Sequence, residues 1–175
     1  MHGGMGHMVF KQSKGLDIVA AKPDQVNQPN TPAQLQQREK FAQGARYAKG
    51  ALADATMKAL YVAKAKAVNK PPFALAVEDY LTPPVVDAID LGGYHKHIGD
   101  AILIKAHDDL EVTGVTVSIV DNAQAPVETG PATFDAASGA WKYVATADAS
   151  AKPGVTVTVN ALDHPGHSGT LSATA

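Results

Sequence analysis

The 175-residue chain contains no cysteine, which excludes disulfide bonds and thiolate chemistry. It also lacks the run of about 18 apolar residues that a transmembrane helix needs. The first ten residues, MHGGMGHMVF, have neither the charged region nor the apolar stretch of a signal peptide. We therefore expect no membrane span and synthesis in the cytoplasm, with assembly into a particle or arrival at a surface by another route as open alternatives.

Familiar catalytic motifs are missing as well. The sequence has no serine elbow, no His-Glu-x-x-His motif and no phosphate-binding loop. The glycines at residues 3–6 lack the strand and helix that flank such a loop, so we expect a flexible terminus there. Glu78 and Asp79 are neighbours on an expected helix and project in different directions, which favours a solvated face over an acid–base pair. We predict that the protein is not an enzyme.

The composition is typical of a folded globular chain, with 45% hydrophobic and 18% charged residues. The charge is divided unevenly. Residues 1–84 hold 11 Lys and Arg against 6 Asp and Glu, a net charge of +5, whereas residues 85–175 hold 4 against 11, a net charge of −7, and together they give −2. This asymmetry favours contact of the basic half with a nucleic acid, an anionic surface or the acidic half of another copy. A chance distribution over two solvated surfaces is the alternative.

The first thirty residues predict a β-hairpin and a connector. Two short apolar runs, residues 7–11 and 16–20, are separated by QSKG, in which Gly15 suits a turn. Two strands alone are marginally stable in water, so the hairpin must pack on the following helices or on another chain. Residues 22–30 contain two prolines and no periodicity, which indicates an extended connector.

A helix start follows directly. Thr31 suits the N-cap, Pro32 suits the first helical position, and Gln34 completes a capping box. We expect a helix from Pro32 to about Lys49 that ends at Gly50. Apolar residues at helical spacing predict its buried stripe: Phe41, Ala45, Ala48 and Leu52.

Two further helices are expected. Asp54 suits the cap of a helix over residues 55–68, which ends at the Lys-Pro-Pro of residues 70–72. Residues 73–81 (FALAVEDYL) predict a short third helix, which Thr82-Pro83-Pro84 closes. The second helix is basic through Lys58, Lys64, Lys66 and Lys70.

From Val85 onward, short runs rich in β-branched and aromatic residues alternate between apolar and polar positions, with Gly, Pro, Asn and Asp between them. About seven short strands in such a stretch are typical of an antiparallel sandwich. Trp141, Tyr143 and Ala145 occupy alternate positions and so share one face of their strand, which favours core packing over a sugar-binding platform. The clearest strands are residues 85–91, 101–106, 112–120, 141–146 and 155–162.

Two resemblances support this division of the chain. The stretches IGDAILIKAHDDLEVTGVTVSIVD (98–121), SGAWKYVAT (138–146) and PGVTVTVNALDHPGHSG (153–169) resemble the bacterial immunoglobulin-like modules found on surface, adhesion and virion proteins. That resemblance implies a fold and no particular ligand. Residues 6–49 resemble the start of small uncharacterised bacterial proteins that have a Gly-rich hairpin and then a helix, and no activity is implied. The matching residues there are Lys22-Pro23, Asn27, Pro29, Thr31-Pro32-Ala33-Gln34 and Gln37-Arg38.

The expected fold class is therefore α+β. An N-terminal segment of residues 1–84 contains the β-hairpin and two or three helices, and residues 85–175 form an all-β immunoglobulin-like sandwich.

Seven histidines raise the question of a metal site. His95 and His97 lie between the first two expected strands and His164 and His167 between the last two, and in an immunoglobulin-like sandwich these loops lie at opposite ends. His107 lies at the same end as the last loop. The candidate metal ligands are accordingly His107, Asp109, His164 and His167.

Zinc and calcium are the candidate metals, and the protein is otherwise expected to work without a cofactor. Asp108-Asp109 and Asp121-Asn122 supply oxygen atoms that suit calcium, but no twelve-residue EF-hand loop is present, and a capping or turn role is favoured.

The leading hypothesis is a structural or interaction protein in which the sandwich is a spacer or adhesive unit and the N-terminal segment mediates self-association or binding to another protein. The first alternative is association with nucleic acid through the basic helices. The second alternative is a glycan- or metal-binding module.

Overall fold

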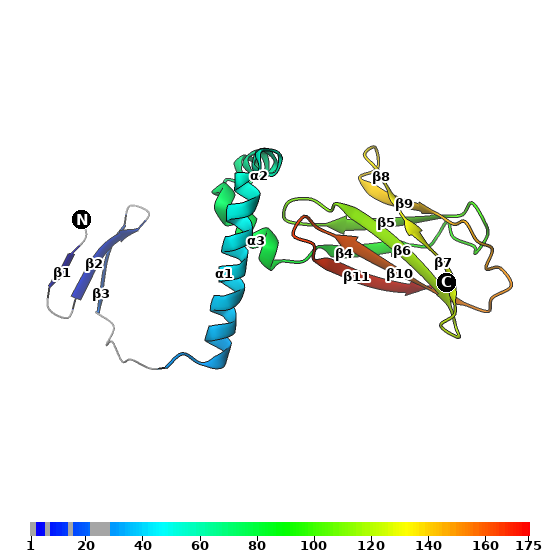
Figure 1. Cartoon of the computed structure of the whole chain (residues 1–175), viewed down its shortest axis with the longest axis horizontal. Helices are drawn as coiled ribbons and strands as arrows, with labels where there is room; N and C mark the ends of the chain where they lie inside the picture. The colour runs from blue at the N-terminus through cyan, green and yellow to red at the C-terminus, as the bar shows by residue number, and fades with distance from the viewer. Residues whose placement is uncertain (1–2, 6–7, 14–15, 22–28) are drawn as a thin grey trace. The chain divides into compact units, whose positions relative to one another are not determined.

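The computed structural model describes residues 3–5, 8–13, 16–21 and 29–175. The chain divides into two compact units, Met1–Leu35 and Gln36–Ala175. It combines three helices with antiparallel sheets, so the predicted mixed α+β class is confirmed (Figure 1). In the described part of the chain, no helix is long and apolar enough to cross a membrane.

The first unit contains a three-stranded antiparallel sheet. Strands β2 (Met8–Ser13) and β3 (Leu16–Ala21) form the predicted hairpin. A third strand, β1 (Gly3–Met5), pairs with β2, so the expectation of a flexible terminus is wrong there. Backbone groups alone make these pairings, and the glycines therefore need no side chain to join the sheet. The expected turn glycine and residues 22–28 of the expected connector lie outside the described residues.

Helix α1 spans Pro32–Ala53, and the predicted capping box is confirmed. The backbone N–H of Thr31 donates to Oε1 of Gln34 at 2.9 Å, and the N–H of Gln34 donates to Oγ1 of Thr31 at 3.3 Å. The predicted end at Gly50 is wrong, because the helix continues to Ala53 and stops only where the next helix cap begins.

The buried stripe of α1 also differs from the prediction. Ala48 is buried as expected, but Phe41 is 55% exposed. The second buried residue of α1 is instead Gly44, where an added Cβ would lie 3.4 Å from side-chain atoms of Val77 and Tyr80 on α3. A search for apolar side chains at helical spacing does not find this contact, because glycine has no side chain.

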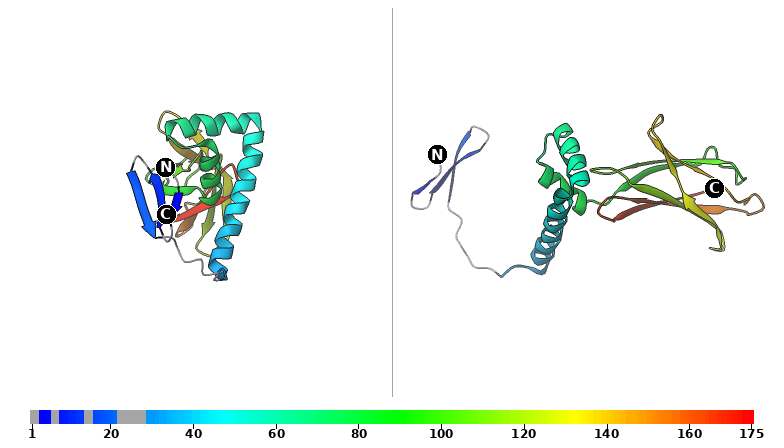
Figure 2. Two further views of the ribbon diagram at one scale, coloured as in Figure 1. Left: turned by 90° about the vertical axis from the view of Figure 1, so that its left-hand side faces the viewer. Right: turned by 45° about the horizontal axis from the view of Figure 1, so that its top comes forward.

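Helices α2 (Ala55–Ala67) and α3 (Pro72–Leu81) match the predicted second and third helices. Oδ1 of Asp54 accepts the N–H of Met57 at 2.8 Å, which confirms the predicted cap. One residue separates α1 from α2, and Figure 2 shows the corner that they form. The helical core includes a leucine from the loop after β5, and its buried residues are Ala48, Tyr61, Ala65, Leu75, Ala76, Val77 and Leu110.

Residues 85–175 form two four-stranded antiparallel sheets. The first has the order β4 (Val85–Asp90), β5 (Ala101–His107), β9 (Ala140–Val144), β8 (Thr133–Asp135). The second has the order β11 (Ser168–Thr174), β10 (Val155–Leu162), β6 (Gly114–Asp121), β7 (Pro126–Pro131). The five strands predicted most clearly are all present, and β11 is the expected last strand after His167. With β7 and β8, residues 85–175 contain eight strands, against about seven predicted.

The two sheets share one hydrophobic core. Alternate residues of the central strands β6 and β10 are buried, as the alternating pattern predicts. Burial of one valine or isoleucine side chain contributes about 1.5–3 kcal/mol to folding. The central valines and isoleucines of the core are fully buried: Ile102, Ile104, Val117, Ile119, Val155, Val157 and Val159.

Candidate functional site

The loop between β5 and β6 and the loop between β10 and β11 lie at the same end of the two sheets. Nε2 of His164 lies 2.9 Å from Oε1 of Glu111, which joins the two loops directly. The loop that carries His95 and His97 lies instead beside residues 148–152, because Nζ of Lys96 donates to the carbonyl oxygen of Lys152 at 3.0 Å. The prediction that the two histidine pairs do not converge is therefore confirmed.

The three histidines among the four predicted metal ligands, His107, His164 and His167, each pair with a different carboxylate, whereas Oδ2 of the fourth, Asp109, is buried without a hydrogen bond in the described part of the chain. Nδ1 of His107 lies 2.8 Å from Oδ2 of Asp87. His164 pairs with Glu111, and Nδ1 of His167 lies 3.3 Å from Oδ2 of Asp163. Among residues 3–5, 8–13, 16–21 and 29–175, no three histidine or acidic side chains stand together as a group that could hold a metal ion. A metal at this histidine set stays a prediction.

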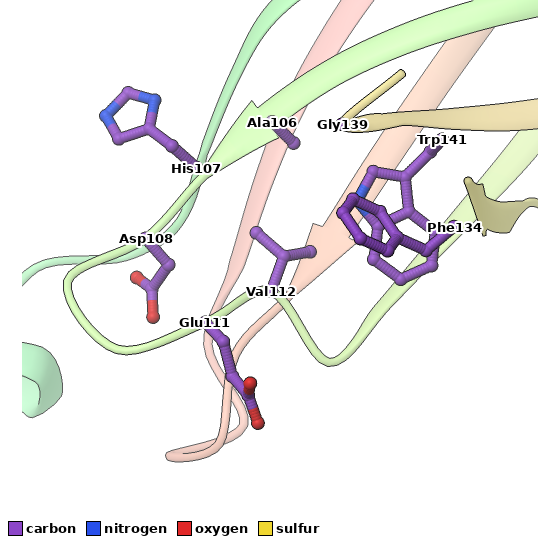
Figure 3. Close-up of a pocket in the computed structure, with 8 residues that line it drawn as sticks. All are labelled: Ala106, His107, Asp108, Glu111, Val112, Phe134, Gly139 and Trp141. Carbon is purple, nitrogen blue, oxygen red and sulfur yellow. The ribbon is translucent and has the colours of Figure 1, made fainter. Parts of the chain in front are cut away.

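A hollow of about 380 Å³ opens beside these loops (Figure 3). Phe134 on β8 and Trp141 on β9 are directly opposite each other across the two strands, with ring centroids 5.3 Å apart. Trp141 contacts the core and is half-buried, whereas Phe134 is 55% exposed. The prediction that Trp141 packs in the core is thus met only in part, since the indole also lines the hollow.

The hollow has two chemically different flanks (Figure 3). The aromatic rings and Val112 form an apolar flank, and His107, Asp108 and Glu111 form a polar one. A ligand that fits this hollow would offer an apolar face to the rings and hydrogen-bond donors to the exposed carboxylate of Glu111.

Next to the hollow, Asp79 of α3 is buried, with 0% of its surface exposed. The hydroxyl of Tyr61 donates to Oδ2 of Asp79 at 2.5 Å, and the hydroxyl of Tyr47 lies 3.0 Å from that of Tyr61. The expected solvated face is therefore wrong for Asp79. Its neighbour Glu78 is partly exposed and pairs with Lys70 at 2.6 Å.

Asp79 faces the carboxyl group of Asp108. Burial raises the pKa of Asp79 to about 7, against the opposing effect of the Tyr61 hydroxyl, and the facing Asp108 acts in the same direction as burial. Burial likewise raises the pKa of Asp108. Both carboxyl groups are thus held where ionisation is unfavourable.

The loop between β10 and β11 adds Asp163 to this cluster. Its Oδ1 accepts the backbone N–H of His167 at 2.6 Å, and its side chain is 0% exposed. The ring of His167 lies edge-on to the ring of Tyr80, with centroids 4.9 Å apart. We name Asp79, Asp108 and Asp163 the junction carboxylates, because they lie where α3 meets the two sandwich loops.

A signal for Asp79 is present in the sequence. It follows Leu75 by four residues and Ala76 by three, so all three share one face of α3. An acidic residue on the apolar face of a helix indicates a buried carboxylate. A test of Glu78 and Asp79 as an acid–base pair does not reveal this, because the two residues lie on different faces of the helix.

Comparisons with known proteins give no family. No family model matches the chain, and no curated protein matches it. A solved structure, described as a tetra-tandem repeat in the extending region of a large adhesion protein, aligns with 53% of this chain at 23% identity and a TM-score of 0.35. The chain spans 23% of the length of that protein. Similarity at this level establishes neither fold nor function.

Proposed function

We propose that this chain is a non-enzymatic structural or interaction protein, in which an immunoglobulin-like sandwich of residues 85–175 is joined to an N-terminal segment of residues 1–84 that mediates self-association. The strand order supports the immunoglobulin-like part. The order β4-β5-β9-β8 corresponds to strands A-B-E-D, and β11-β10-β6-β7 corresponds to G-F-C-C′ of that fold.

The observation that carries the assembly role is the apolar surface of the N-terminal sheet. The pairing of Phe10 with Val19 and of Met8 with Ala21 places these side chains on one face, and Leu16 and Ile18 lie on the other. Every side chain of β3 is exposed, with Leu16 at 70%. A three-stranded sheet with apolar residues on both faces needs a covering surface to be stable in water.

A second copy of the same sheet provides that cover. Two identical sheets packed face to face around a twofold axis bury the same residues on each partner. Both outer strands, β1 and β3, also offer unpaired backbone groups to another strand. The exposed apolar side chains and the two edge strands of the sheet therefore both favour self-association.

Light scattering coupled to size exclusion tests this proposal. The full chain is expected to form an oligomer, and Val19→Asp, which places a charge on the apolar face, is expected to lower the mass to that of a monomer. Val62→Asp on α2 is the matched control, because Val62 is also an exposed valine but lies outside the sheet. A parent chain that is monomeric at every concentration would refute the assembly role.

Glycan binding is a second candidate, and the aromatic hollow favours it. The rings of Phe134 and Trp141 offer stacking area, and Glu111 offers an acceptor for hydroxyl groups. Phe134→Ala is expected to abolish binding to any saccharide found on an array, whereas Phe41→Ala, an equally exposed phenylalanine on α1, leaves binding unchanged. An array without a hit for the parent chain eliminates this candidate.

Association with nucleic acid gains less support. Of the four lysines that suggested it, Lys64 donates to the carbonyl oxygen of Leu110 at 3.2 Å and Lys70 pairs with Glu78. The ion pair offsets the charge of Lys70, and the contact with Leu110 directs the ammonium group of Lys64 toward the protein. The nucleic-acid hypothesis stays a prediction.

A further inference from the structure

Two of the junction carboxylates, Asp79 of α3 and Asp108 of the loop between β5 and β6, face each other without a donor between them. Within the described residues, Oδ1 of Asp79 and both side-chain oxygens of Asp108 are buried and make no hydrogen bond. Buried polar atoms are normally paired, because an unpaired one loses its hydration without compensation. Two ionised carboxylates in this position would also repel each other.

The groups around Asp79 supply no positive charge. It is faced by Tyr61 of α2, by Asp108, and by Asp163 of the loop between β10 and β11. In the part of the chain that the structure describes, no lysine or arginine forms an ion pair with Asp79 or Asp108. Lys64 of α2 donates to a backbone carbonyl instead, and His167 lies beside Asp163, with 3.3 Å between Nδ1 and Oδ2. A proton on Asp79 or Asp108 answers both difficulties, because a carboxylic acid is uncharged and donates a hydrogen bond.

The surroundings of the two carboxyl groups decide which of them carries the proton. The hydroxyl of Tyr61 donates to Oδ2 of Asp79, which leaves Oδ1 to carry a proton. Burial raises the pKa of Asp108, but the backbone N–H groups of Asp109 and Leu110 oppose that rise. Asp79 has no backbone donor of this kind. The proton therefore belongs on Asp79 and the negative charge on Asp108.

We propose that Asp79 keeps its proton at neutral pH and donates it to Asp108, and that this hydrogen bond is a pH-sensitive contact between α3 and the loop between β5 and β6. Loss of the proton removes the hydrogen bond and leaves two negative charges facing each other. The loop then moves away from α3 or admits water. The contact lies within the unit Gln36–Ala175 and does not depend on self-association of the N-terminal sheet.

The loop connects this contact to the aromatic hollow. Leu110 of the loop packs in the helical core, and the next two residues, Glu111 and Val112, line the hollow together with Trp141. A loop that moves away from α3 therefore changes the wall of the hollow. Trp141 is the single tryptophan of the chain, so its fluorescence reports on that change.

The effect on stability has a defined sign. The pKa of an aspartate is about 3.9 in an unfolded chain, whereas burial raises the pKa of Asp79 to about 7. The folded chain therefore binds more protons than the unfolded chain between these two values. The stabilisation that the protonated Asp79 provides is complete below about pH 4, is lost as the pH rises to about 7, and does not change further above that pH.

Carboxyl NMR of the full chain with ¹³C-labelled aspartate follows Asp79 directly. We expect one side-chain signal to titrate with a midpoint near pH 7, and we expect that signal to be absent from Asp79→Asn. The proposal is wrong if every aspartate signal of the parent chain titrates below about pH 5, where ordinary carboxyl groups ionise.

Thermal unfolding compares the parent with Asp79→Asn, whose amide donates to Asp108 and accepts from Tyr61 at every pH. Relative to this variant, the melting temperature of the parent is expected to fall by about 5–10 °C between about pH 4 and pH 7 and then to stay constant. Glu78→Gln is the matched control, because Glu78 is the exposed neighbour on the same helix, and it should follow the parent. A difference between parent and Asp79→Asn that is the same at every pH would overturn the proposal.

The fluorescence of Trp141 tests the movement of the loop. The parent and Glu78→Gln are expected to show a change with a midpoint near pH 7 that Asp79→Asn lacks. Titration of His107, which also lines the hollow, is common to all three proteins, so the difference between them isolates Asp79. Equal fluorescence changes in the three proteins would refute a connection between the contact and the hollow.

Discussion

At the scale of single residues, many carboxylates of residues 85–175 build turns. Oδ1 of Asp121 accepts the N–H groups of Ala123 and Ala125, each at 2.9 Å, and its Oδ2 accepts Nζ of Lys152 at 2.8 Å. Oε2 of Glu128 accepts four donors, among them the hydroxyl of Tyr143 at 2.9 Å. Burial, and then Glu128, raise the pKa of Tyr143 to about 12. These acidic side chains of residues 85–175 therefore serve as hydrogen-bond acceptors that hold turns and strand ends in place.

Asp121→Ala is expected to lower the free energy of unfolding by about 1–3 kcal/mol, because two backbone N–H groups lose their acceptor. Asp148→Ala is the matched control, since Asp148 is exposed, accepts the backbone N–H of Ser150 and lies 3.8 Å from Nδ1 of the exposed His97. Its loss is expected to stay below about 1 kcal/mol. Equal losses in urea unfolding of the two variants would contradict the role assigned to Asp121.

The effect of Asp121 depends on pH in a defined direction. The contact with Lys152 lowers the pKa of Asp121, and the backbone N–H groups act in the same direction. A depressed pKa in the folded state means that the stabilisation is complete above the unfolded pKa of about 3.9 and is lost as the pH falls through the folded value. The difference between parent and Asp121→Ala should therefore shrink in acid.

Single residues also mark the limit of the sequence patterns. Spacing predicts which positions share one face of a helix, and it places Ala48 correctly. Spacing does not show which residue of the helix contacts its neighbour. Only the packed structure shows that Gly44 contacts α3 and that Phe41, the predicted contact, is exposed.

At the scale of elements, strong local signals predicted the structure well. The caps at Thr31 and Asp54 are satisfied within three residues, so the sequence alone contains both partners. Strands buried on one face, such as β6 and β10, show clear alternation. The strands with the weakest sequence signals lie at sheet edges: β7 has a proline at each end, β8 has three residues, and β11 is rich in small polar residues.

The close approach of β11 to the backbone before β4 requires a glycine at position 169. A Cβ on Gly169 of β11 would collide with the backbone carbonyl of Pro84, just before β4 begins. Gly169→Ala is expected to destabilise the chain by about 3 kcal/mol, because a backbone atom cannot rotate away. The same substitution at Gly114, where a Cβ meets nothing within 4 Å, should change stability by less than about 1 kcal/mol. Similar urea midpoints for both variants would contradict this prediction, because they would mean that β11 can move away from Pro84 without loss of stability.

At the scale of the whole molecule, the sequence does not show that Asp79, Asp108 and Asp163 lie close together in the fold. Asp79 is separated from Asp108 by a helix end and two strands, and Asp163 comes 55 positions after Asp108. Only the arrangement of α3 against the two loops brings them together, and no local pattern encodes that. The division of the chain into domains 1–84 and 85–175 likewise stays a prediction, whereas the change from helices to strands at Val85 is confirmed.

The opposed charges of the two halves provide a second measurement on self-association. Packing of apolar sheets should persist or strengthen as salt is added, whereas head-to-tail contact of the +5 and −7 halves should weaken once the Debye length falls to about 3 Å at 1 M salt. We expect the oligomer to survive 1 M salt. Dissociation at high salt would instead assign the contact to the charged halves.

The register of the outermost strands has a mechanical consequence. Val85 pairs with His107 beside the junction carboxylates, whereas Ala175 exchanges backbone hydrogen bonds with Val155, which is opposite Asp121 at the far end of the sheets. The chain thus enters at one end and leaves at the other. Tension between these points runs along β4 and β11, and their hydrogen bonds lie across that direction. We therefore expect the hydrogen bonds that pair β4 with β5 and β11 with β10 to be loaded together in shear, and the two sheets to resist stretching more than if these bonds broke one after another.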